Sequence, residues 1–220
     1  MLDWTNLLAG RFLVFDGPDG SGKSTQLRRF AEHATAAGMP PVDVREPGGT
    51  PIGEAIREVL LDPRYDEMEL RCEMLLYMAS RSQLVKERIR PALDAGGFVL
   101  ADRFISSTLA YQGTAGGLDP EEILAVGRVA TRGCEPDLVV ILDVDTETAA
   151  TRLPAQLDRM EQKGMAFHKR VRQGYLAQAE RDPARHLVID GSRTEEEVFR
   201  SLLEGVGARL STIVAAESAS

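Results

Sequence analysis

Nine consecutive residues near the start of the chain have the types and the spacing needed to hold a nucleoside triphosphate. Residues 17–25 read Gly-Pro-Asp-Gly-Ser-Gly-Lys-Ser-Thr and fit the pattern G-x-x-x-x-G-K-[ST]. In this pattern the glycines let backbone N–H groups converge on phosphates, a lysine reaches the outer phosphates, and a hydroxyl ligates Mg²⁺. The segment therefore predicts a site for a nucleoside triphosphate with magnesium, formed by Gly17, Asp19, Gly20, Ser21, Gly22, Lys23, Ser24 and Thr25.

The residues around this loop predict the two elements that it needs. Residues 12–15 are all apolar, as in a buried parallel strand, and apolar residues recur at helical spacing after the loop. A strand, a glycine-rich turn and a helix N-terminus together form a phosphate-binding unit. An accidental glycine turn is the alternative, and the flanking pattern makes it the weaker one.

Four more strands are predicted at residues 41–45, 98–101, 138–142 and 186–189. Five short apolar strands separated by helices indicate a doubly wound parallel α/β sheet with right-handed crossovers. Such sheets bind ligands at the carboxyl ends of their strands. Glu46, Asp102 and Asp143 each follow a predicted strand, so we expect them at the same edge as Gly17.

Two further motifs lie at this edge. Residues 45–50 read Arg-Glu-Pro-Gly-Gly-Thr, and Arg57 lies in the predicted helix that follows. A tight strand-to-helix turn explains this motif as well, and taken alone it is the better explanation. Asp102 and Arg103 follow the strand at 98–101, where a carboxylate can hold Mg²⁺ and a guanidinium can clamp a phosphoryl oxygen. Tyr111 and Gln112 come soon after, which favours a site over a solvated turn.

A charged segment near residue 160 has two interpretations. Residues 157–161 read Leu-Asp-Arg-Met-Glu and have several basic neighbours. A solvated helix face explains such a run well. The functional alternative is a mobile lid that brings Arg159 over the transferring phosphate.

Composition and charge are those of an ordinary globular chain. The 220 residues are 43 % hydrophobic and 27 % charged, which supports a core without disulfides or metal. We expect one domain over residues 1–220, with a core over about 11–208, a short lid insert over about 148–164 and a disordered tail over about 214–220. The net charge of −8 disfavours nucleic acid as a partner.

The sequence also indicates where the protein works. No apolar run is long enough to span a membrane, and residues 1–10 lack the features of a secretory signal. Cys72 and Cys134 fit no metal-ligand spacing, so we expect buried or partly buried free thiols in a reducing cytosol. We therefore expect a cytoplasmic protein without a membrane partner.

Together, these motifs resemble those of bacterial thymidylate kinases. The resemblance rests on residues 17–25 and 45–50, on Asp102-Arg103-Phe104 with Ala110-Tyr111-Gln112-Gly113, and on residues 157–161, in family order. It runs from about residue 11 to about residue 206. It implies a P-loop NTPase-type sheet with helices on both faces, and transfer of the γ-phosphoryl group of ATP to thymidine monophosphate with Mg²⁺, a step towards dTTP. It also implies a homodimer built by helix packing.

The resemblance implies roles for individual residues. Lys23 would neutralise the β and γ phosphates, Ser24 would ligate the metal, and Thr25 would contact the α-phosphate. Arg103 would bridge the donor and acceptor phosphates, with Asp102 supporting the metal and the geometry. Further contacts are implied for Asp19 with the acceptor 3′-hydroxyl, Arg57 with the acceptor phosphate, and Ser192 and Arg193 with adenine.

The resemblance also implies how the base and sugar are bound. Tyr77 would stack on the base, and Arg81, one helical turn later, would reach a thymine carbonyl. Tyr111 would lie against the 2′ position of the sugar and so favour deoxyribose. The acceptor site would be completed by Glu46, Pro47, Ser107, Thr108 and Gln112, with Thr108 and Gln112 at the base edge.

Two features depart from the family pattern. Position 20 is glycine, where some members carry a catalytic arginine, so this chain resembles the type with that arginine in the lid. The segment before Asp158 is poor in arginine, and Pro154 should break a helix there. We select Arg159 as the lid arginine and Arg152 as the second choice.

Three other functions stay open from the sequence. A kinase for another nucleoside monophosphate is the nearest, although the Tyr77, Arg81 and Tyr111 set favours a pyrimidine deoxynucleotide. The hypothesis of a nucleotide-dependent switch or ATPase is less favoured, because the chain has neither the guanine motif Asn-Lys-x-Asp nor the signature motif Leu-Ser-Gly-Gly-Gln. A catalytically silent binding protein is disfavoured by the intact Lys23 and Arg103.

Overall fold

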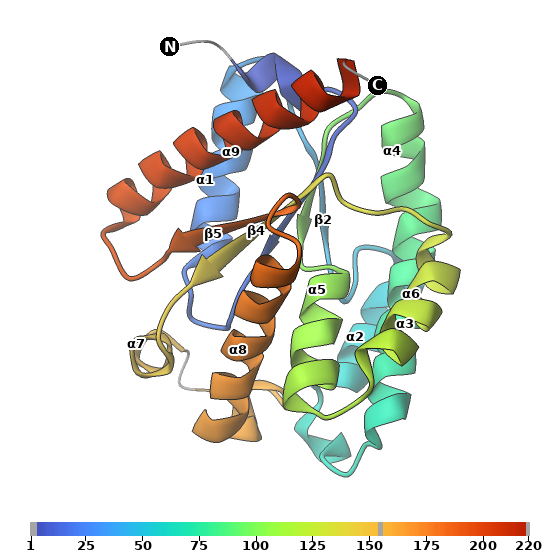
Figure 1. The fold of residues 1–220 in the computed structure, drawn as a ribbon. Coiled ribbons are helices and arrows are strands. Elements are labelled where there is room, and N and C mark those ends of the chain that lie inside the picture. The colour runs from blue at the N-terminus through green and yellow to red at the C-terminus, as the bar shows by residue number, and fades with distance from the viewer. Residues whose placement is uncertain (1–3, 154–155, 219–220) are drawn as a thin grey trace.

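Five strands form one parallel sheet in the order β2-β3-β1-β4-β5 (Figure 1). The computed structural model describes residues 4–153 and 156–218. The strands are β1 (Phe12–Asp16), β2 (Val42–Arg45), β3 (Val99–Asp102), β4 (Leu138–Asp143) and β5 (His186–Asp190). All adjacent pairs are parallel. The predicted sheet is therefore confirmed, and no strand boundary differs from its prediction by more than one residue.

Helices connect successive strands. The α-helices are α1 (Lys23–Ala36), α2 (Pro51–Leu61), α3 (Leu70–Leu84), α4 (Arg90–Asp94), α5 (Ile105–Thr108), α6 (Pro120–Thr131), α7 (Thr146–Thr151), α8 (Met165–Arg181) and α9 (Glu195–Ser218). Shorter 3₁₀ segments are η1 (Trp4–Leu8), η2 (Pro63–Tyr65) and η5 (Glu161–Lys163), and π-helical turns are η3 (Val85–Ile89) and η4 (Leu109–Ala115). Thr194 and Glu197 form a capping box at the start of α9.

Two hydrophobic layers cover the two faces of the sheet. Successive strand residues point to opposite faces, so Leu13 and Phe15 pack with α1 and α9, while Phe12 and Val14 pack towards α5 and α8. Figure 1 shows α1 and α9 on one side of the strands and α8 and α5 on the other. Because both faces are covered, the three central strands β1, β3 and β4 are apolar up to the aspartate that ends each of them.

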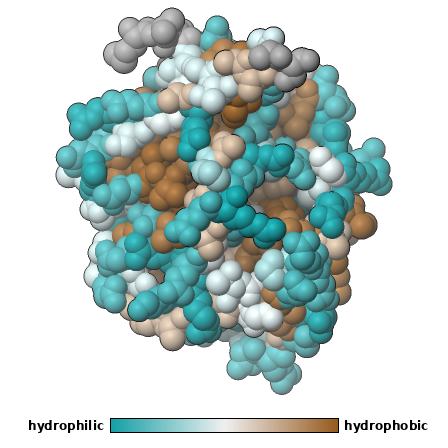
Figure 2. Space-filling view, in the orientation of Figure 1, coloured by the Kyte–Doolittle hydropathy of each residue, from teal (hydrophilic) through white to brown (hydrophobic). Residues whose placement is uncertain are grey.

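Most of the surface seen in Figure 2 is polar, with apolar side chains exposed over β5 and beside α6. Exposed apolar residues lie on α2, α3 and α6, among them Ile52, Leu75 and Val129. Of the helices in the described part of the chain, none is long and apolar enough to cross a membrane.

Two predictions about local order and burial are wrong. The tail predicted to be disordered from residue 214 is helical through Ser218, because its alanines favour helix and Glu217 pairs with Arg11 at 2.5 Å. Residues 219–220 of that tail lie outside the described residues. Both cysteines are free, but Cys72 is exposed on α3, and only Cys134 is buried.

Candidate active site

The phosphate loop joins β1 to α1 and needs its glycines. Gly17 has φ +138° and Gly20 has φ +77°, and a Cβ would lie 2.4 Å and 2.3 Å from the backbone oxygens of Leu142 and Ala149 respectively. Gly22 adopts the left-handed conformation as the N-cap of α1 and supplies no side-chain cap. The loop thus packs tightly on its neighbours and leads into an uncapped helix N-terminus, which is an anion-binding arrangement.

Two hollows lie beside this loop. One, of about 400 Å³, lies along Pro18–Thr25 and is also lined by Arg152, Leu153 and Glu161. An adjoining hollow of about 230 Å³ is lined by Ser21, Thr25, Arg152 and Arg193, among others. Arg193 therefore lies beside the loop, and its contact with adenine stays a prediction. Ser192 is exposed, and its hydroxyl donates to Asp190.

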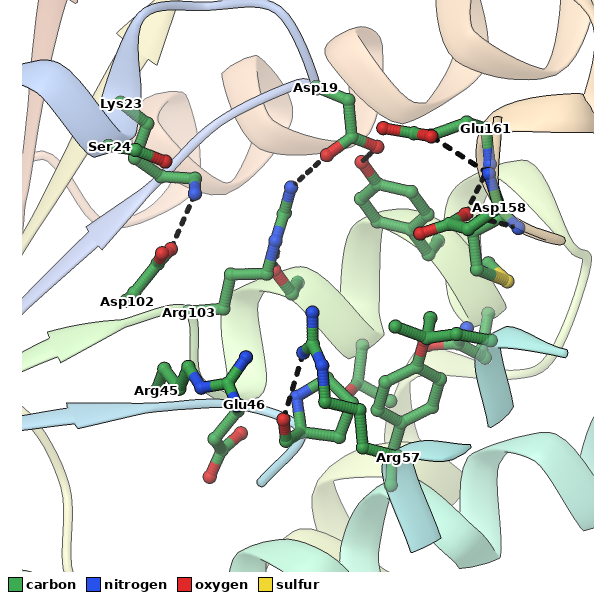
Figure 3. Close-up of a pocket in the computed structure, with 18 residues that line it drawn as sticks. Asp19, Lys23, Ser24, Arg45, Glu46, Arg57, Asp102, Arg103, Asp158 and Glu161 are labelled. Atoms are coloured by element: carbon green, nitrogen blue, oxygen red, sulfur yellow. Dashed lines mark hydrogen bonds and ion pairs between the residues drawn. The ribbon is translucent and has the colours of Figure 1, made fainter. Parts of the chain in front are cut away.

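The carboxyl edge of the sheet also holds a polar cavity, with a volume of about 250 Å³. Its walls come from the loop, α2, α3, β3, η4 and the segment before η5 (Figure 3). The structure brings together most of the predicted acceptor residues there: Asp19, Glu46, Pro47, Arg57, Tyr77, Asp102, Arg103, Ser107, Thr108, Tyr111 and Gln112. Asp143 is separate from them and pairs with Arg172 at 2.7 Å.

Lys23 and Ser24 connect the loop to this cavity. The Lys23 ammonium donates to the Asp102 carboxylate, as the dashed line in Figure 3 shows. Ser24 lines both the cavity and the hollow along the loop. Lys23, Ser24 and Asp102 thus lie at the junction where a phosphate on the loop would meet a ligand in the cavity.

Arg103 is fixed at the centre of the site by several acceptors. Its backbone has φ +72°, a left-handed conformation that is uncommon for a residue with a side chain. Its guanidinium pairs with Asp19 and donates to Ser107 Oγ at 3.1 Å and to the Tyr175 hydroxyl at 3.0 Å. Tyr111 donates to the same Asp19 carboxylate at 2.6 Å.

This environment keeps Asp19 ionised. Burial alone would raise the pKa of Asp19, but the Arg103 guanidinium and the Tyr111 hydroxyl together hold that pKa below its ordinary value. Burial raises the pKa of Tyr111, so its hydroxyl remains a donor. A half-buried, ionised carboxylate paired with a fixed guanidinium can orient a polar ligand group that binds beside the pair.

Sequence reasoning missed two residues behind Arg103. Asp16, fully buried at the end of β1, accepts hydrogen bonds from Ser106 at 2.5 Å, Ser107 at 2.6 Å and Tyr175 at 2.6 Å. Asp16 could have been found, because an aspartate that ends an otherwise apolar buried strand is unusual. Tyr175 lies 159 residues further along the chain, on α8, and carries no such signal.

The side chain of Arg81 contacts protein groups behind the cavity wall. Its fully buried guanidinium pairs with Glu46 at 2.5 Å and donates to Thr108 Oγ1 at 3.2 Å. Burial raises the pKa of Glu46 to about 7, although Arg81 lowers it. Arg81 does not line the cavity in this arrangement, because Glu46 and Thr108 engage its donors, and its contact with a bound base stays a prediction.

Two other arginines do face the cavity. Arg57 donates to the backbone oxygen of Pro47 at 2.9 Å, and Arg45, at the end of β2, pairs with Glu54 at 2.8 Å. Figure 3 shows both side chains among the residues that line the cavity. Arg45 was not predicted as a site residue, although its position at a strand end follows the same rule as Asp102.

Arg159 lies away from the phosphate loop. It is 4 % exposed, pairs with Glu73 of α3 at 2.6 Å, and donates from Nε to the backbone oxygen of Leu60 at 2.7 Å. The arginine that lies beside the loop is instead Arg152, which donates to the Gly191 oxygen at 3.0 Å. Pro154, predicted to break a helix here, lies outside the described residues. In this arrangement a buried carboxylate holds Arg159, and the choice of Arg159 over Arg152 stays a prediction.

Known proteins are similar to this chain in sequence and in fold over most of its length. The family model described as Thymidylate kinase matches residues 15–202. The thymidylate kinase of Pelotomaculum thermopropionicum is 48 % identical over 200 residues, covering 90 % of this chain and 93 % of the relative. That of Deinococcus radiodurans is 45 % identical over 202 residues, covering 91 % and 98 %.

A solved structure agrees with the two sequence matches. The crystal structure of thymidylate kinase from Ehrlichia chaffeensis superposes with a TM-score of 0.74 at 30 % identity, covering 91 % of this chain and 98 % of the other. The family model covers well over half of the chain, and the relatives match it nearly end to end. The chain therefore belongs to the thymidylate kinase family.

Proposed function

We propose that the loop and the polar cavity together transfer the γ-phosphoryl group of ATP to thymidine monophosphate, giving thymidine diphosphate. The observation that carries this proposal is the junction of the two sites. Lys23 and Ser24 belong to the loop and also line the cavity in which Asp102 and Arg103 lie. A phosphate bound on the loop would therefore meet a second phosphate bound in the cavity.

ATP binds on the loop side. The uncapped start of α1 and the Lys23 ammonium supply positive potential for the phosphates. We assign the adenine side to the hollow lined by Thr25, Arg152 and Arg193. Arg152 lines both hollows beside the loop. We therefore assign it the role of the lid arginine, which places a positive charge beside the phosphates.

Thymidine monophosphate binds in the cavity. Arg57 and Arg45 face the cavity and offer donors to the acceptor phosphate. Tyr77 offers an aromatic face to the base, and Gln112 a hydrogen-bonding amide. Tyr111 and Asp19 lie together and fit the sugar. We assign Arg81 an indirect role, since it fixes Glu46 and Thr108 from behind.

The residues present fit a magnesium ion. Ser24 and Asp102 line the same cavity and offer hydroxyl and carboxylate oxygens, which are the hard ligands that Mg²⁺ prefers. In the described residues, no cluster of three or more His, Cys, Asp or Glu side chains could hold a metal alone. Such a sparse protein set is typical of Mg²⁺, which keeps waters and phosphate oxygens as ligands and would neutralise charge on the transferring phosphoryl group.

The mechanism then rests on positioning and charge. A loose phosphoryl-transfer transition state requires in-line alignment and neutralised oxygens more than a strong base. Lys23 and Arg103 follow two neighbouring strands, and their partners Asp102 and Asp19 hold both cations in place before the ligands arrive. This preorganisation lowers the cost of ordering them in the transition state.

We also infer a homodimer that works in the cytoplasm. Exposed apolar residues on α2, α3 and α6 support helix packing between two copies. The two free thiols suit a reducing compartment.

The reaction is tested by coupled ADP release with Mg-ATP and a panel of monophosphates. The acceptors are thymidine, deoxyuridine, uridine, cytidine and adenosine monophosphates, each compared with a reaction without acceptor. We expect thymidine monophosphate to give the highest kcat/KM. Turnover that depends on another monophosphate alone would contradict the acceptor assignment, and ADP release independent of any acceptor would indicate an ATPase.

A further inference from the structure

Glu73 is a buried carboxylate for which the phosphoryl transfer described above has no use. It lies on α3, is 1 % exposed, and belongs to the same helix face as Tyr77, one turn later. Its partners are Gln112 of η4 and two cations from the segment near residue 160, Arg159 and Lys163. The bond from Gln112 Nε2 to Glu73 Oε1 measures 2.7 Å and is buried.

These contacts fix which end of the Gln112 amide faces the carboxylate. An ionised carboxylate only accepts hydrogen bonds, so the amide nitrogen must face Glu73. Arg159 at 2.6 Å and Lys163 at 3.2 Å form ion pairs with Glu73 Oε2, while Oε1 accepts the hydrogen bond from Gln112. Gln112 also lines the acceptor cavity. Its carbonyl oxygen is then the end of the amide left for a bound base.

We propose that Glu73 is a positioning residue that sets base selectivity by presenting the Gln112 oxygen, a pure acceptor, to the cavity. The inference rests on the proposed function. Thymine carries a donor at N3–H, whereas cytosine has an acceptor at N3. A fixed acceptor therefore pairs with thymine and opposes cytosine. Uracil shares the N3–H donor, so the Gln112 oxygen does not distinguish thymine from uracil.

The same geometry predicts what happens when the charge of Glu73 is removed. In Glu73→Gln, Arg159 still needs an acceptor, so the new amide turns its oxygen to Arg159 and its nitrogen to Gln112. Gln112 must then reverse and present its own nitrogen to the cavity. That donor suits the N3 acceptor of cytosine and leaves the N3–H of thymine without a partner.

The test compares kcat/KM for thymidine, deoxyuridine and deoxycytidine monophosphates in four proteins: the parent, Glu73→Gln, Lys163→Met, and the exchange variant Glu73→Gln/Gln112→Glu. In Glu73→Gln we expect the preference for thymidine over deoxycytidine monophosphate to fall about 10-fold or more. The preference for thymidine over deoxyuridine monophosphate should stay unchanged. Lys163→Met removes a cation from the same carboxylate but keeps the acceptor for Gln112, so it should keep both preferences.

The exchange variant keeps the proposal testable if Glu73→Gln does not fold. The amide introduced at position 73 would accept from Arg159 and donate to the carboxylate at position 112, whose second oxygen again offers an acceptor to the base. We expect this variant to recover the parent's preference for thymidine over deoxycytidine monophosphate. An unchanged preference in Glu73→Gln, an equal fall in Lys163→Met, or an exchange variant without the preference would overturn the proposal. A parent enzyme that does not phosphorylate thymidine monophosphate would instead contradict the proposed function.

Discussion

Arg103 is the residue on which most contacts of the site converge. Its guanidinium reaches Asp19, Ser107 and Tyr175, and its backbone holds an uncommon left-handed conformation. Such conformations persist only where surrounding contacts fix them, and they gather at functional sites. The planar fork of arginine matches phosphoryl oxygens in a way that a lysine ammonium does not.

Arg103→Lys should therefore lower kcat far more than it raises KM for thymidine monophosphate. We expect kcat to fall about 10²-fold or more, because one positive charge remains but the bidentate geometry is lost. Steady-state kinetics with saturating Mg-ATP measures both constants. Arg28→Lys, on the exposed pair with Glu32, is the control and should match the parent. A loss confined to KM would show that Arg103 contributes only to binding.

Glu46 gives the site a pH-dependent stability. Burial raises its pKa from the ordinary 4.5 to about 7. A carboxyl that holds its proton more tightly in the folded chain stabilises the fold below about pH 4.5, and this stabilisation is lost as the pH rises towards about 7. The full effect is on the order of 3 kcal/mol.

The variant Glu46→Gln cannot titrate, so its melting temperature relative to the parent should rise with pH. Loss of the Arg81 pair shifts the variant by an offset at every pH, so the slope of the difference is the informative quantity. We expect the difference to grow by several degrees between about pH 5 and about pH 8, at about 2–4 °C per kcal/mol. Glu32→Gln, on the exposed pair, should show no slope. A flat difference for Glu46→Gln would mean that this carboxyl does not titrate in that range.

At the scale of elements, the phosphate loop depends on close packing against α7. The position of the Gly20 Cβ would overlap the backbone oxygen of Ala149, which belongs to α7. Any side chain at position 20 therefore requires α7 and the loop to move apart. This gives a structural reason why position 20 is glycine in this chain.

Gly20→Ala should weaken ATP binding as well as stability. We expect about 1–3 kcal/mol of destabilisation from the left-handed backbone and the overlap, together with a clear rise in KM for ATP. Gly38→Ala is a matched control, because Gly38 has φ +84° but open space around its Cβ position. Gly38→Ala should lower the stability of the fold but leave KM for ATP unchanged. Equal KM values for ATP in the two variants would contradict the proposed packing requirement.

At the scale of the whole molecule, the fold could be predicted almost completely. The central strands β1, β3 and β4 are short apolar runs, and five predicted strands separated by helices leave few arrangements other than a parallel sheet. The phosphate loop was equally predictable, because all of its residues are contiguous. The tail after residue 214 was mistaken for disorder, since its anchor, Arg11, lies 206 residues earlier.

The side-chain partners within the site were less predictable. The sequence does not show which carboxylate pairs with Arg81 or with Arg159. It likewise gives no sign that Glu73 is such a partner. Those choices depend on packing between α3, η4 and the segment before η5, which are far apart in sequence. Arg159 was therefore expected over the phosphate, and Glu73 was not recognised as its buried partner.

The exposed apolar residues of α2, α3 and α6 predict association of two chains. Light scattering in solution should give about twice the chain mass of 24.0 kDa. Leu75→Asp, which places a charge on an exposed position of α3, should shift the mass towards one chain. A single-chain mass for the parent at working concentrations would contradict the proposed dimer.

The most direct test follows the labelled γ-phosphate of ATP. The protein is incubated with Mg²⁺, γ-labelled ATP and thymidine monophosphate, and the nucleotides are separated and counted. The account predicts label in thymidine diphosphate, with the rate reduced about 10³-fold or more in Lys23→Ala. Label released as inorganic phosphate, or label in thymidine diphosphate at the same rate in Lys23→Ala, would contradict the account.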